Sequence, residues 1–498
     1  MHSLAPGAIV RREYWGGLGV LINQGEFELD DKTTSLLRAL KHTNNPAQIA
    51  QILQAIHDVR VTPADVDRLL DEATRSGFVV KDGAPRQCNV AEVTRQFVDE
   101  IADVRDLTFL SAPLNVSIYP GMKCNLSCQF CFVSQEKWDD DNIAYPLEQW
   151  IPVLDQIKAM EIPYLTILGG EPLLYPEIWP MLDYLDQTGQ KTHITTNGTV
   201  VSDRVISELK RHPNITLKVS IQSLDDRHSL LTKGNLHKTL RFIESARSAG
   251  IDLGIHTVGL PDTVDQVYPL ADYAASQGLN EFSMGVFFNI NQVELEEFSL
   301  EEYRAMQQRT KEYITEKYGA SLGYRLEGCQ IWTAEPTVKW EWVPTTPFGI
   351  LRSGCEAAQA RLEIMNDGTL LACSLFDKHT FGGGNVFEEP LKHLWRTAKS
   401  FQELRELKTE DHACSQCNYE FFCHGGCPAL NYKKTGNLRA GDDRCGIRNR
   451  LIQWVFGICD GLLSHRTYTK PCPLVLIDVI SIQRCPVNNG LMRLPESR

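Results

Sequence analysis

The sequence of 498 residues predicts an α/β protein, in which a partial barrel of six strand–helix units lies between a small N-terminal domain and a cysteine-rich C-terminal domain. Three observations predict this class. Strand-like and amphipathic helical segments alternate from residue 112 to residue 320. Short strands and three capped helices precede that stretch. Ten of the 15 cysteines fall into two groups, one directly after the first predicted barrel strand and one after the barrel.

Residues 1–95 are expected to form a winged-helix domain. Short strands are expected at residues 9–14, 18–22, 25–29 and 78–80. Helices are expected over residues 31–42, from Asn45-Pro46, and from Thr62-Pro63. Asn45 and Thr62 are good N-caps, each is followed by a proline, and Asp65 completes a capping box. Residues 96–111 are expected to be a linker, with a short helix around residues 93–101.

Residues 112–320 are expected to form the barrel. Its strands are expected at residues 114–119, 164–168, 191–196, 215–221, 253–258 and 281–288. Each unit spans roughly 25–50 residues, which suits right-handed βα repeats in a parallel sheet. Six such units indicate an incomplete (β/α)₈ barrel. Periodicity alone also allows a doubly wound open sheet, and this alternative stays open here.

The rest of the chain divides into three parts. Residues 321–349 are expected to bridge the barrel and a cysteine-rich domain at residues 350–450, and residues 451–498 are expected to be a helix and a tail. The formal charge is −13, from 50 basic and 63 acidic residues, which argues against a protein that coats nucleic acid or anionic membranes. No apolar run is long enough for a membrane span, and no signal peptide is evident, so we expect a cytoplasmic protein.

The first cysteine group has metal-ligand spacing. Cys124, Cys128 and Cys131 form a C-x₃-C-x₂-C run after the first barrel strand. Three thiolates can hold three irons of a cubane cluster and leave the fourth iron open to a ligand. The alternative is a zinc site or incidental thiols, but structural zinc needs four ligands and no fourth follows locally. Active sites of such barrels lie at the carboxyl ends of strands, where this loop begins.

Other strand ends carry residues that suit a bound small molecule. They are Gly169, Gly170, Glu171, Pro172, Asn197, Ser220 and Gln222. Paired glycines let a ligand approach the backbone closely, and Glu171 could accept a hydrogen bond from an ammonium group. Taken singly, these are common turns or satisfied interior groups. Their occurrence at successive strand ends favours a binding site.

These motifs resemble the radical SAM superfamily over about residues 112–320. Cys124, Cys128 and Cys131 match its signature, with the aromatic Phe130 before the last cysteine. The Gly-Gly-Glu-Pro run matches its methionine-binding strand end. Ser220 and Gln222 match positions that usually contact the ribose, and Lys233 stands where an arginine is usual.

The resemblance implies a [4Fe–4S] cluster whose open iron chelates S-adenosylmethionine. One-electron reduction would then give methionine and a 5′-deoxyadenosyl radical, which abstracts a substrate hydrogen. No residue is assigned as an acid or a base.

The second cysteine group resembles the SPASM extension of radical SAM enzymes. Its members are Cys355, Cys373, Cys414, Cys417, Cys423, Cys427 and Cys445. Zinc is the alternative, but seven cysteines exceed one tetrahedral site and fall short of two. The resemblance implies two auxiliary [4Fe–4S] clusters, and therefore three clusters in all.

The resemblance also divides these cysteines between the two auxiliary clusters. Cys414, Cys417, Cys423 and Cys445 would hold the distal one. Cys355, Cys373 and Cys427 would hold the nearer one, with either Cys329 or an open iron at its fourth position.

The N-terminal domain has about as many acids as bases and no basic stripe, which argues against DNA binding. Joined to such an enzyme, it resembles the peptide-recognition element of ribosomal peptide maturases. That resemblance implies that a leader peptide adds a strand beside residues 25–29, against the helix at 63–76.

We therefore expect a radical SAM/SPASM oxidoreductase that modifies a ribosomally made precursor peptide. The expected product is an intramolecular thioether or carbon–carbon crosslink, and the expected electron donor is a flavodoxin or ferredoxin. One alternative is oxidation of a protein Ser or Cys, as in anaerobic sulfatase maturation. An alternative from another class is a zinc-dependent nucleic-acid-binding regulator.

Overall fold

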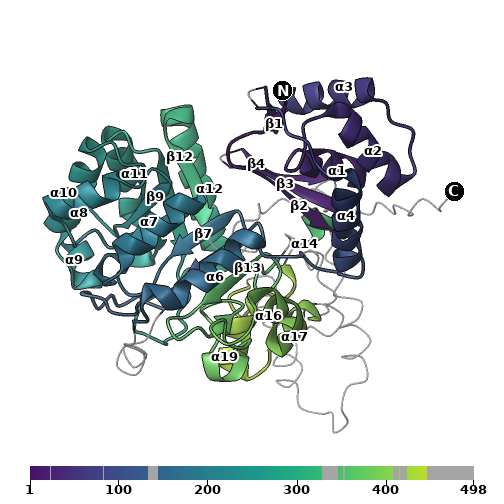
Figure 1. Cartoon of the computed structure of the whole chain (residues 1–498). Coiled ribbons are helices and arrows are strands. Elements are labelled where there is room, and N and C mark those ends of the chain that lie inside the picture. Colours follow the sequence, from purple (N-terminus) through teal and green to yellow (C-terminus); the bar gives the residue numbers. More distant parts are fainter. Residues whose placement is uncertain are drawn as a thin grey trace, which may run out of the picture.

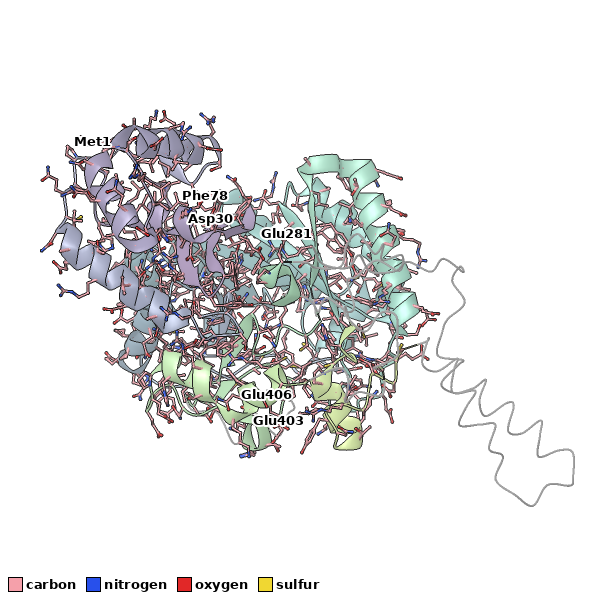
Figure 2. The ribbon with its side chains drawn as sticks, turned by 90° about the vertical axis from the view of Figure 1, so that its right-hand side faces the viewer. Met1, Asp30, Phe78, Glu281, Glu403 and Glu406 are labelled. Carbon is pink, nitrogen blue, oxygen red and sulfur yellow. The ribbon has the colours of Figure 1, made fainter. Side chains whose placement is uncertain are left out.

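The computed structural model of the chain describes residues 1–22, 24–81, 83–132, 144–327, 346–351, 354–407, 414 and 423–445. Cys329, Cys417 and the expected tail at 451–498 lie outside the described residues. Figure 1 shows an N-terminal domain beside an α/β barrel, with the C-terminal helices next to both. Figure 2 gives a second view, in which Phe78 marks the N-terminal domain, Glu281 the barrel and Glu403 the C-terminal domain.

The N-terminal domain combines a small sheet with three helices, as expected of a winged helix. The antiparallel sheet has β2 (Ala8–Glu13), β3 (Gly16–Leu21) and β4 (Gly25–Leu29) in that order. The helices are α1 (Asp31–Ala39), α2 (Pro46–His57) and α3 (Pro63–Arg75). Asn45 caps α2, and Thr62 and Asp65 form the predicted capping box of α3. The predicted start sites of both helices are confirmed.

Two further strands and one helix complete this domain. β1 (Ser3–Leu4) pairs antiparallel with β5 (Val79–Val80). β1 was not expected, because a strand of two residues has no periodicity to detect. The helix α4 (Val90–Val104) is longer than the short helix expected around residues 93–101. Its buried Val93 and Phe97 pack into the core formed by α1, α2 and α3.

The barrel wall is a run of parallel strands in sequence order. They are β6 (Asn115–Ile118), β7 (Tyr164–Ile167), β8 (Thr192–Thr196), β9 (Ile215–Ser220), β10 (Leu253–Gly259), β11 (Glu281–Val286) and β12 (Gly323–Glu327). Each strand pairs with the next one along the chain, whereas a doubly wound sheet reverses its order at a switch point. The barrel prediction is therefore confirmed and the doubly wound alternative is wrong.

The six predicted strands are all present, and β12 is an additional one. Its residues were expected to belong to the bridging region, because a Gly-Tyr-Arg-Leu-Glu run carries little apolar signal. Tyr324 stacks on Phe282 of β11 with ring centroids 6.0 Å apart, which extends the sheet at this edge. Tertiary packing thus produces a strand that the local sequence does not predict.

Helices cover the outer face of the barrel. They are α6 (Leu147–Ala159), α7 (Ile178–Thr188), α8 (Asp203–Lys210), α9 (Asp226–Thr232), α10 (Leu236–Ser248), α11 (Val267–Ser276) and α12 (Leu300–Tyr318). Their apolar stripes, with fully buried residues such as Trp150 and Phe242, pack on Val116, Leu165 and Leu217 of the strands. None of the described helices is both long and apolar enough to span a membrane.

The C-terminal domain continues the barrel wall on the side of β6. β13 (Arg361–Ile364) pairs parallel with β6, and β14 (Leu370–Leu371) pairs antiparallel with β13. Short helices follow: α15 (Lys378–Phe381), α16 (Leu391–Thr397), α17 (Lys399–Arg405) and α19 (Pro428–Thr435). Because β13 joins the barrel sheet directly, this domain is fixed against the first barrel strand.

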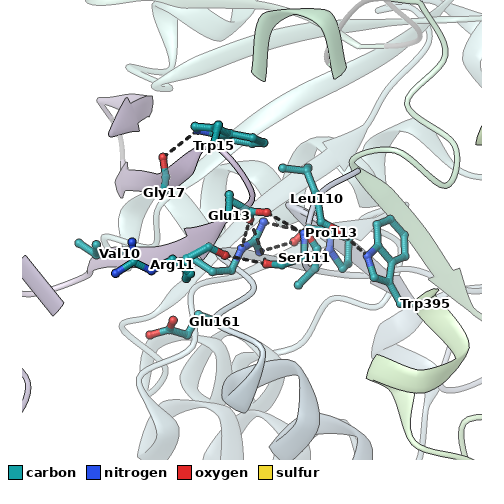
Figure 3. A network of polar contacts seen from close by, with 12 residues as sticks. Val10, Arg11, Glu13, Trp15, Gly17, Leu110, Ser111, Pro113, Glu161 and Trp395 are labelled. Carbon is teal, nitrogen blue, oxygen red and sulfur yellow. Dashed lines mark hydrogen bonds and ion pairs between the residues drawn. The ribbon is translucent and has the colours of Figure 1, made fainter. Parts of the chain in front are cut away.

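The N-terminal domain is attached at the amino ends of the barrel strands (Figure 3). Arg11 of β2 donates to the carbonyls of Ala112 and Pro113 at 2.7 and 2.9 Å, just before β6 begins. Arg11 also pairs with Glu13 at 2.7 Å, and both side chains are buried. Glu13 accepts a hydrogen bond from the backbone N–H of Ser111 at 2.7 Å. A buried, fully paired ion pair thus joins this domain to the entrance of β6.

Candidate active site

A cavity of about 1240 Å³ lies at the carboxyl ends of the barrel strands. The cysteine loop after β6 and the ends of β7 to β11 line it, and the C-terminal domain supplies part of the wall. This is the end of a barrel where catalytic residues gather. It is opposite to the end that carries the N-terminal domain.

Cys124, Cys128 and Cys131 all line this cavity. Burial, followed by the charges of Cys131 and Cys124, raises the pKa of Cys128. Burial likewise raises the pKa of Cys124. A buried thiol with a raised pKa becomes a thiolate readily only when a cationic centre binds it. The donor set, sulfur alone, suits iron–sulfur ligation.

The chemistry of the donor set suits a cluster. A cubane places each thiolate on a different iron, whereas a structural zinc ion needs four ligands around one metal. Three cysteines of one loop, all lining the cavity, therefore fit a [4Fe–4S] cluster with one iron left open.

Asn197, at the end of β8, supports the cysteine loop. Its amide nitrogen Nδ2 donates to Asn125 Oδ1 at 3.0 Å and lies 3.9 Å from Cys124 Sγ. The backbone N–H of Leu126 donates to the same sulfur at 3.4 Å. Hydrogen bonds to ligand sulfurs are one way in which a protein sets a cluster's reduction potential. Asn197 also lines the cavity, and its role in binding a small molecule stays a prediction.

Gly169 and Gly170 line the cavity, but the structure gives them a different primary role from the one expected. A Cβ on Gly169 would lie 2.2 Å from the carbonyl oxygen of Gly121, and a Cβ on Gly170 2.2 Å from that of Lys123. The backbone that approaches these glycines is therefore the start of the cysteine loop. Gly169 also has a φ of +137°, which favours glycine.

Glu171 and Pro172 lie behind the cavity surface. The Glu171 side chain is 2% exposed, and its carboxylate accepts hydrogen bonds from Thr196 Oγ1 at 2.6 Å, Asn197 N at 2.7 Å and Leu173 N at 3.1 Å. Burial nevertheless raises the pKa of Glu171. In this arrangement Glu171 positions Asn197, and its contact with an ammonium group stays a prediction.

Ser220 and Gln222 project from the end of β9 into the cavity, together with Phe130 from the loop. Gln222 Oε1 accepts from the backbone N–H of Val258 at 3.0 Å. Its Nε2 is buried and has no hydrogen-bond partner among the described residues. A buried amide donor without a partner suits a ribose hydroxyl as acceptor. Lys233 is placed differently, since it ends α9 in the left-handed region at φ 56° and does not line the cavity.

Sequence reasoning missed several lining residues, among them Lys218, His228, His256, Lys378, His379 and Lys433. Lys218 had a usable signal, since it lies two residues before Ser220 and shares the same strand face. His228 Nδ1 accepts from the backbone N–H of Gln222 at 3.1 Å, a contact between segments that periodicity does not predict. Lys378, His379 and Lys433 reach the cavity only because the C-terminal domain packs on the barrel.

The described cysteines of the second group lie in the C-terminal domain. Gly354 packs against His424, which brings the segment of Cys355 beside Cys423 and Cys427. Asp442 Oδ2 accepts from the backbone N–H of Cys427 at 3.4 Å, and the Asp442 carbonyl accepts from that of Cys445 at 3.2 Å. Their division between two clusters stays a prediction.

Comparison with known families agrees with this geometry. The model of the radical SAM superfamily matches residues 118–274, and the SPASM iron–sulfur cluster-binding domain matches residues 355–418. The chain therefore contains a radical SAM domain and a SPASM domain, and these domains imply that it binds iron–sulfur clusters and S-adenosylmethionine. These matches give the zinc-dependent regulator no support.

Two relatives of known name are similar to this chain over more than four fifths of their own length. The mycofactocin maturase MftC of Mycolicibacterium smegmatis is 23% identical over 370 residues, which cover 68% of this chain and 83% of that protein. The AdoMet-dependent heme synthase of Methanosarcina barkeri is 24% identical over 313 residues, which cover 59% of this chain and 84% of that protein.

Among solved structures, Streptococcus suis SuiB bound to its precursor peptide SuiA has a TM-score of 0.78 at 24% identity, covering 90% of this chain and 100% of that one. That coverage is too large to leave out the N-terminal domain. The fold of SuiB therefore extends beyond the barrel and the SPASM domain of this chain.

Proposed function

We propose that this chain is a maturase that forms an intramolecular thioether or carbon–carbon crosslink in a ribosomally made precursor peptide. The observation that carries the proposal is the N-terminal domain, fixed by buried contacts to a radical SAM barrel. The barrel, its cavity and the cysteine loop serve radical chemistry on many kinds of substrate. A domain with an open sheet edge adds a place for an extended peptide.

The leader site is proposed at β4 and α3. Among the described strands, β4 pairs only with β3, so its other edge is open to a further strand. Phe27 on β4 is 40% exposed and Leu69 on α3 is 38% exposed. The Phe27 ring packs edge-on against Phe78, with centroids 5.6 Å apart. An open edge flanked by exposed apolar side chains gives a peptide both backbone hydrogen bonds and side-chain pockets.

Cys124, Cys128 and Cys131 would hold the catalytic cluster, which supplies the one-electron reduction of S-adenosylmethionine when it is bound. Gly169, Gly170, Asn197, Ser220 and Gln222 would surround the adenosylmethionine. The other residues that line the cavity would exclude water and hold the peptide near the site of radical formation.

Two auxiliary clusters are proposed in the SPASM domain, with the ligand division expected from the sequence. They would accept the electron left on the product radical. The proposed external electron donor is a flavodoxin or ferredoxin in the cytoplasm.

The test is anaerobic reconstitution followed by incubation with the short peptide encoded beside the gene. We expect about twelve irons per chain for three cubanes, formation of 5′-deoxyadenosine, and a peptide lighter by two hydrogen atoms. Cys128→Ala should abolish 5′-deoxyadenosine formation and retain the auxiliary iron.

Oxidation of a serine to an aldehyde gives the same mass change, but only the aldehyde reacts with a hydrazine. A hydrazine-reactive product would contradict the crosslink and favour the sulfatase-maturase type of reaction. Phe27→Lys with Leu69→Lys should weaken leader binding, and unchanged binding would place leader recognition elsewhere.

A further inference from the structure

The charged lining of the cavity is opposite in sign to the chain as a whole. The chain has a formal charge of −13. Among the residues that the structure describes, the cavity lining contains three lysines, Lys218, Lys378 and Lys433, and one carboxylate, Asp377. This excess of cations lies in the space where the proposed peptide would react.

The lysines lie at two depths. Lys218 is on β9, further from the strand end than Ser220, and its ammonium is 3.6 Å from Glu281 Oε1. Burial lowers the pKa of Lys218 to about 8. Lys378 and Lys433 come from α15 and α19, on the side of the cavity formed by the C-terminal domain.

The basic side chains that the C-terminal domain contributes to the cavity, Lys378, His379 and Lys433, differ in their ion pairing. Lys378 lies 3.3 Å from Asp367 and is partly neutralised. The exposed side chains of Lys433 and His379 form no ion pair with another described residue. Lys433 therefore offers an ammonium to a ligand without first breaking an ion pair to any described residue.

The cofactors do not account for this charge. An oxidised cubane with three thiolates carries a single net negative charge, and the sulfonium of S-adenosylmethionine offsets it. The ammonium of Lys433, on the C-terminal side, is thus left for another anion. Electrostatic complementarity of this kind selects partners and raises association rates.

We propose that the peptide segment entering this cavity is acidic, with Asp or Glu side chains that pair with Lys433 and Lys378. This inference rests on the proposed function and specifies its substrate class. The acidic side chains pass between the barrel and the C-terminal domain, and the reacting residue lies next to them. A peptide without acidic residues at this point would lose both affinity and register.

The test measures binding of fluorescently labelled peptides to the full-length, reconstituted enzyme with S-adenosylmethionine, by anisotropy. The probes are glycine–serine peptides with glutamate, glutamine or lysine at the same positions. We expect the glutamate peptide to bind roughly tenfold more tightly than the glutamine peptide, with an advantage that shrinks as salt is raised. Equal binding of the two peptides would overturn the inference.

Substitutions of single lysines test whether Lys433 causes the preference for glutamate. Lys433→Gln should weaken glutamate-peptide binding and Lys433→Arg should retain it. Lys238→Gln, which removes an exposed lysine of α10 outside the cavity lining, is the matched control. Equal losses for Lys433→Gln and Lys238→Gln would count against the proposal.

Lys433→Glu should shift the preference toward the lysine peptide. Because this preference is a ratio within one protein, it survives a general loss of affinity or stability. An unchanged preference for glutamate would contradict the assignment of Lys433. An enzyme that modifies its precursor without any charge preference would defeat this inference alone, whereas absence of peptide modification would defeat the proposed function.

Discussion

The carboxylate of Glu171 accepts a hydrogen bond from the hydroxyl of Thr196 at 2.6 Å. Glu171 follows β7 and Thr196 ends β8, so this contact joins two neighbouring strand ends beside the cavity. The same carboxylate accepts from the backbone N–H of Asn197, whose side chain reaches toward Cys124. A buried carboxylate thus sets the position of the cysteine loop from behind.

Glu171→Gln should impair this support, because an amide nitrogen replaces an oxygen that accepts a hydrogen bond. Loss of such outer contacts typically costs about 10–100-fold in metal affinity or activity. We expect a comparable fall in 5′-deoxyadenosine formation and an altered electron paramagnetic resonance spectrum of the reduced catalytic cluster. Glu208→Gln, at a partly buried position on α8 outside the cavity lining, is the control and should change neither. A wild-type spectrum for Glu171→Gln would show that Asn197 is held by other contacts.

Gly170→Ala should displace the cysteine loop. Its Cβ would lie 2.2 Å from the carbonyl oxygen of Lys123 and 2.3 Å from that of Met122, and these backbone atoms have little room to relax. The variant should lose about four of its irons, those of one cubane, together with adenosylmethionine cleavage. Gly250→Ala is the control: its φ of +76° is unfavourable for alanine, but nothing lies within 4 Å of the new Cβ. It should cost about 1 kcal/mol of stability and keep its iron. Full iron content in Gly170→Ala would refute the crowding argument.

The Arg11–Glu13 pair should behave as a coupled unit. Arg11→Met or Glu13→Leu alone leaves a buried charge without its partner, which costs about 3–5 kcal/mol. The double variant should be less destabilised than the sum of the two single variants, because neither charge then remains. Anaerobic denaturant unfolding of all four proteins gives the coupling free energy. Strictly additive losses would mean that the two side chains act independently.

His228 should make stability depend on pH. Burial lowers the pKa of His228 to about 4, and its Nδ1 must be unprotonated to accept from Gln222. In the unfolded chain the imidazole titrates near 6.5, so the unfolded state binds more protons between pH 6.5 and 4. This contribution to stability is complete above pH 6.5 and is lost as the pH falls toward 4.

At pH 5.5 the loss should be about 1 kcal/mol. Thermal unfolding at pH 7.5 and 5.5 should show a smaller difference for His228→Gln than for the wild type. Equal pH dependence of the two proteins would mean that His228 does not contribute.

The sequence predicted the parts of the molecule that local patterns determine. The capping box at Thr62 and Asp65, the six strands and the cysteine loop all follow from short-range spacing and period. β12 and the β13–β14 pair were not predicted, because their pairing with the barrel depends on contacts between distant segments rather than on local apolar patterns.

Within the site, the sequence predicted which strand ends lie together. It did not predict the direction in which each side chain points. Gly170 admits the loop backbone, and Glu171 points toward β8, because the loop folds back over the end of β7. Lys378 and Lys433 reach the cavity only after the C-terminal domain packs on the barrel. No spacing rule links them to Cys124 across so many residues.

The attachment of the N-terminal domain at Arg11, before β6, has a consequence for any precursor held as proposed. The leader then binds at one end of the barrel and the reacting residue at the other, so the intervening peptide must run the length of the wall. Residues too near the leader cannot reach the cavity. The number of residues between the leader and the reacting residue would therefore decide which residue is modified. Shortening this intervening segment should abolish modification without loss of leader binding.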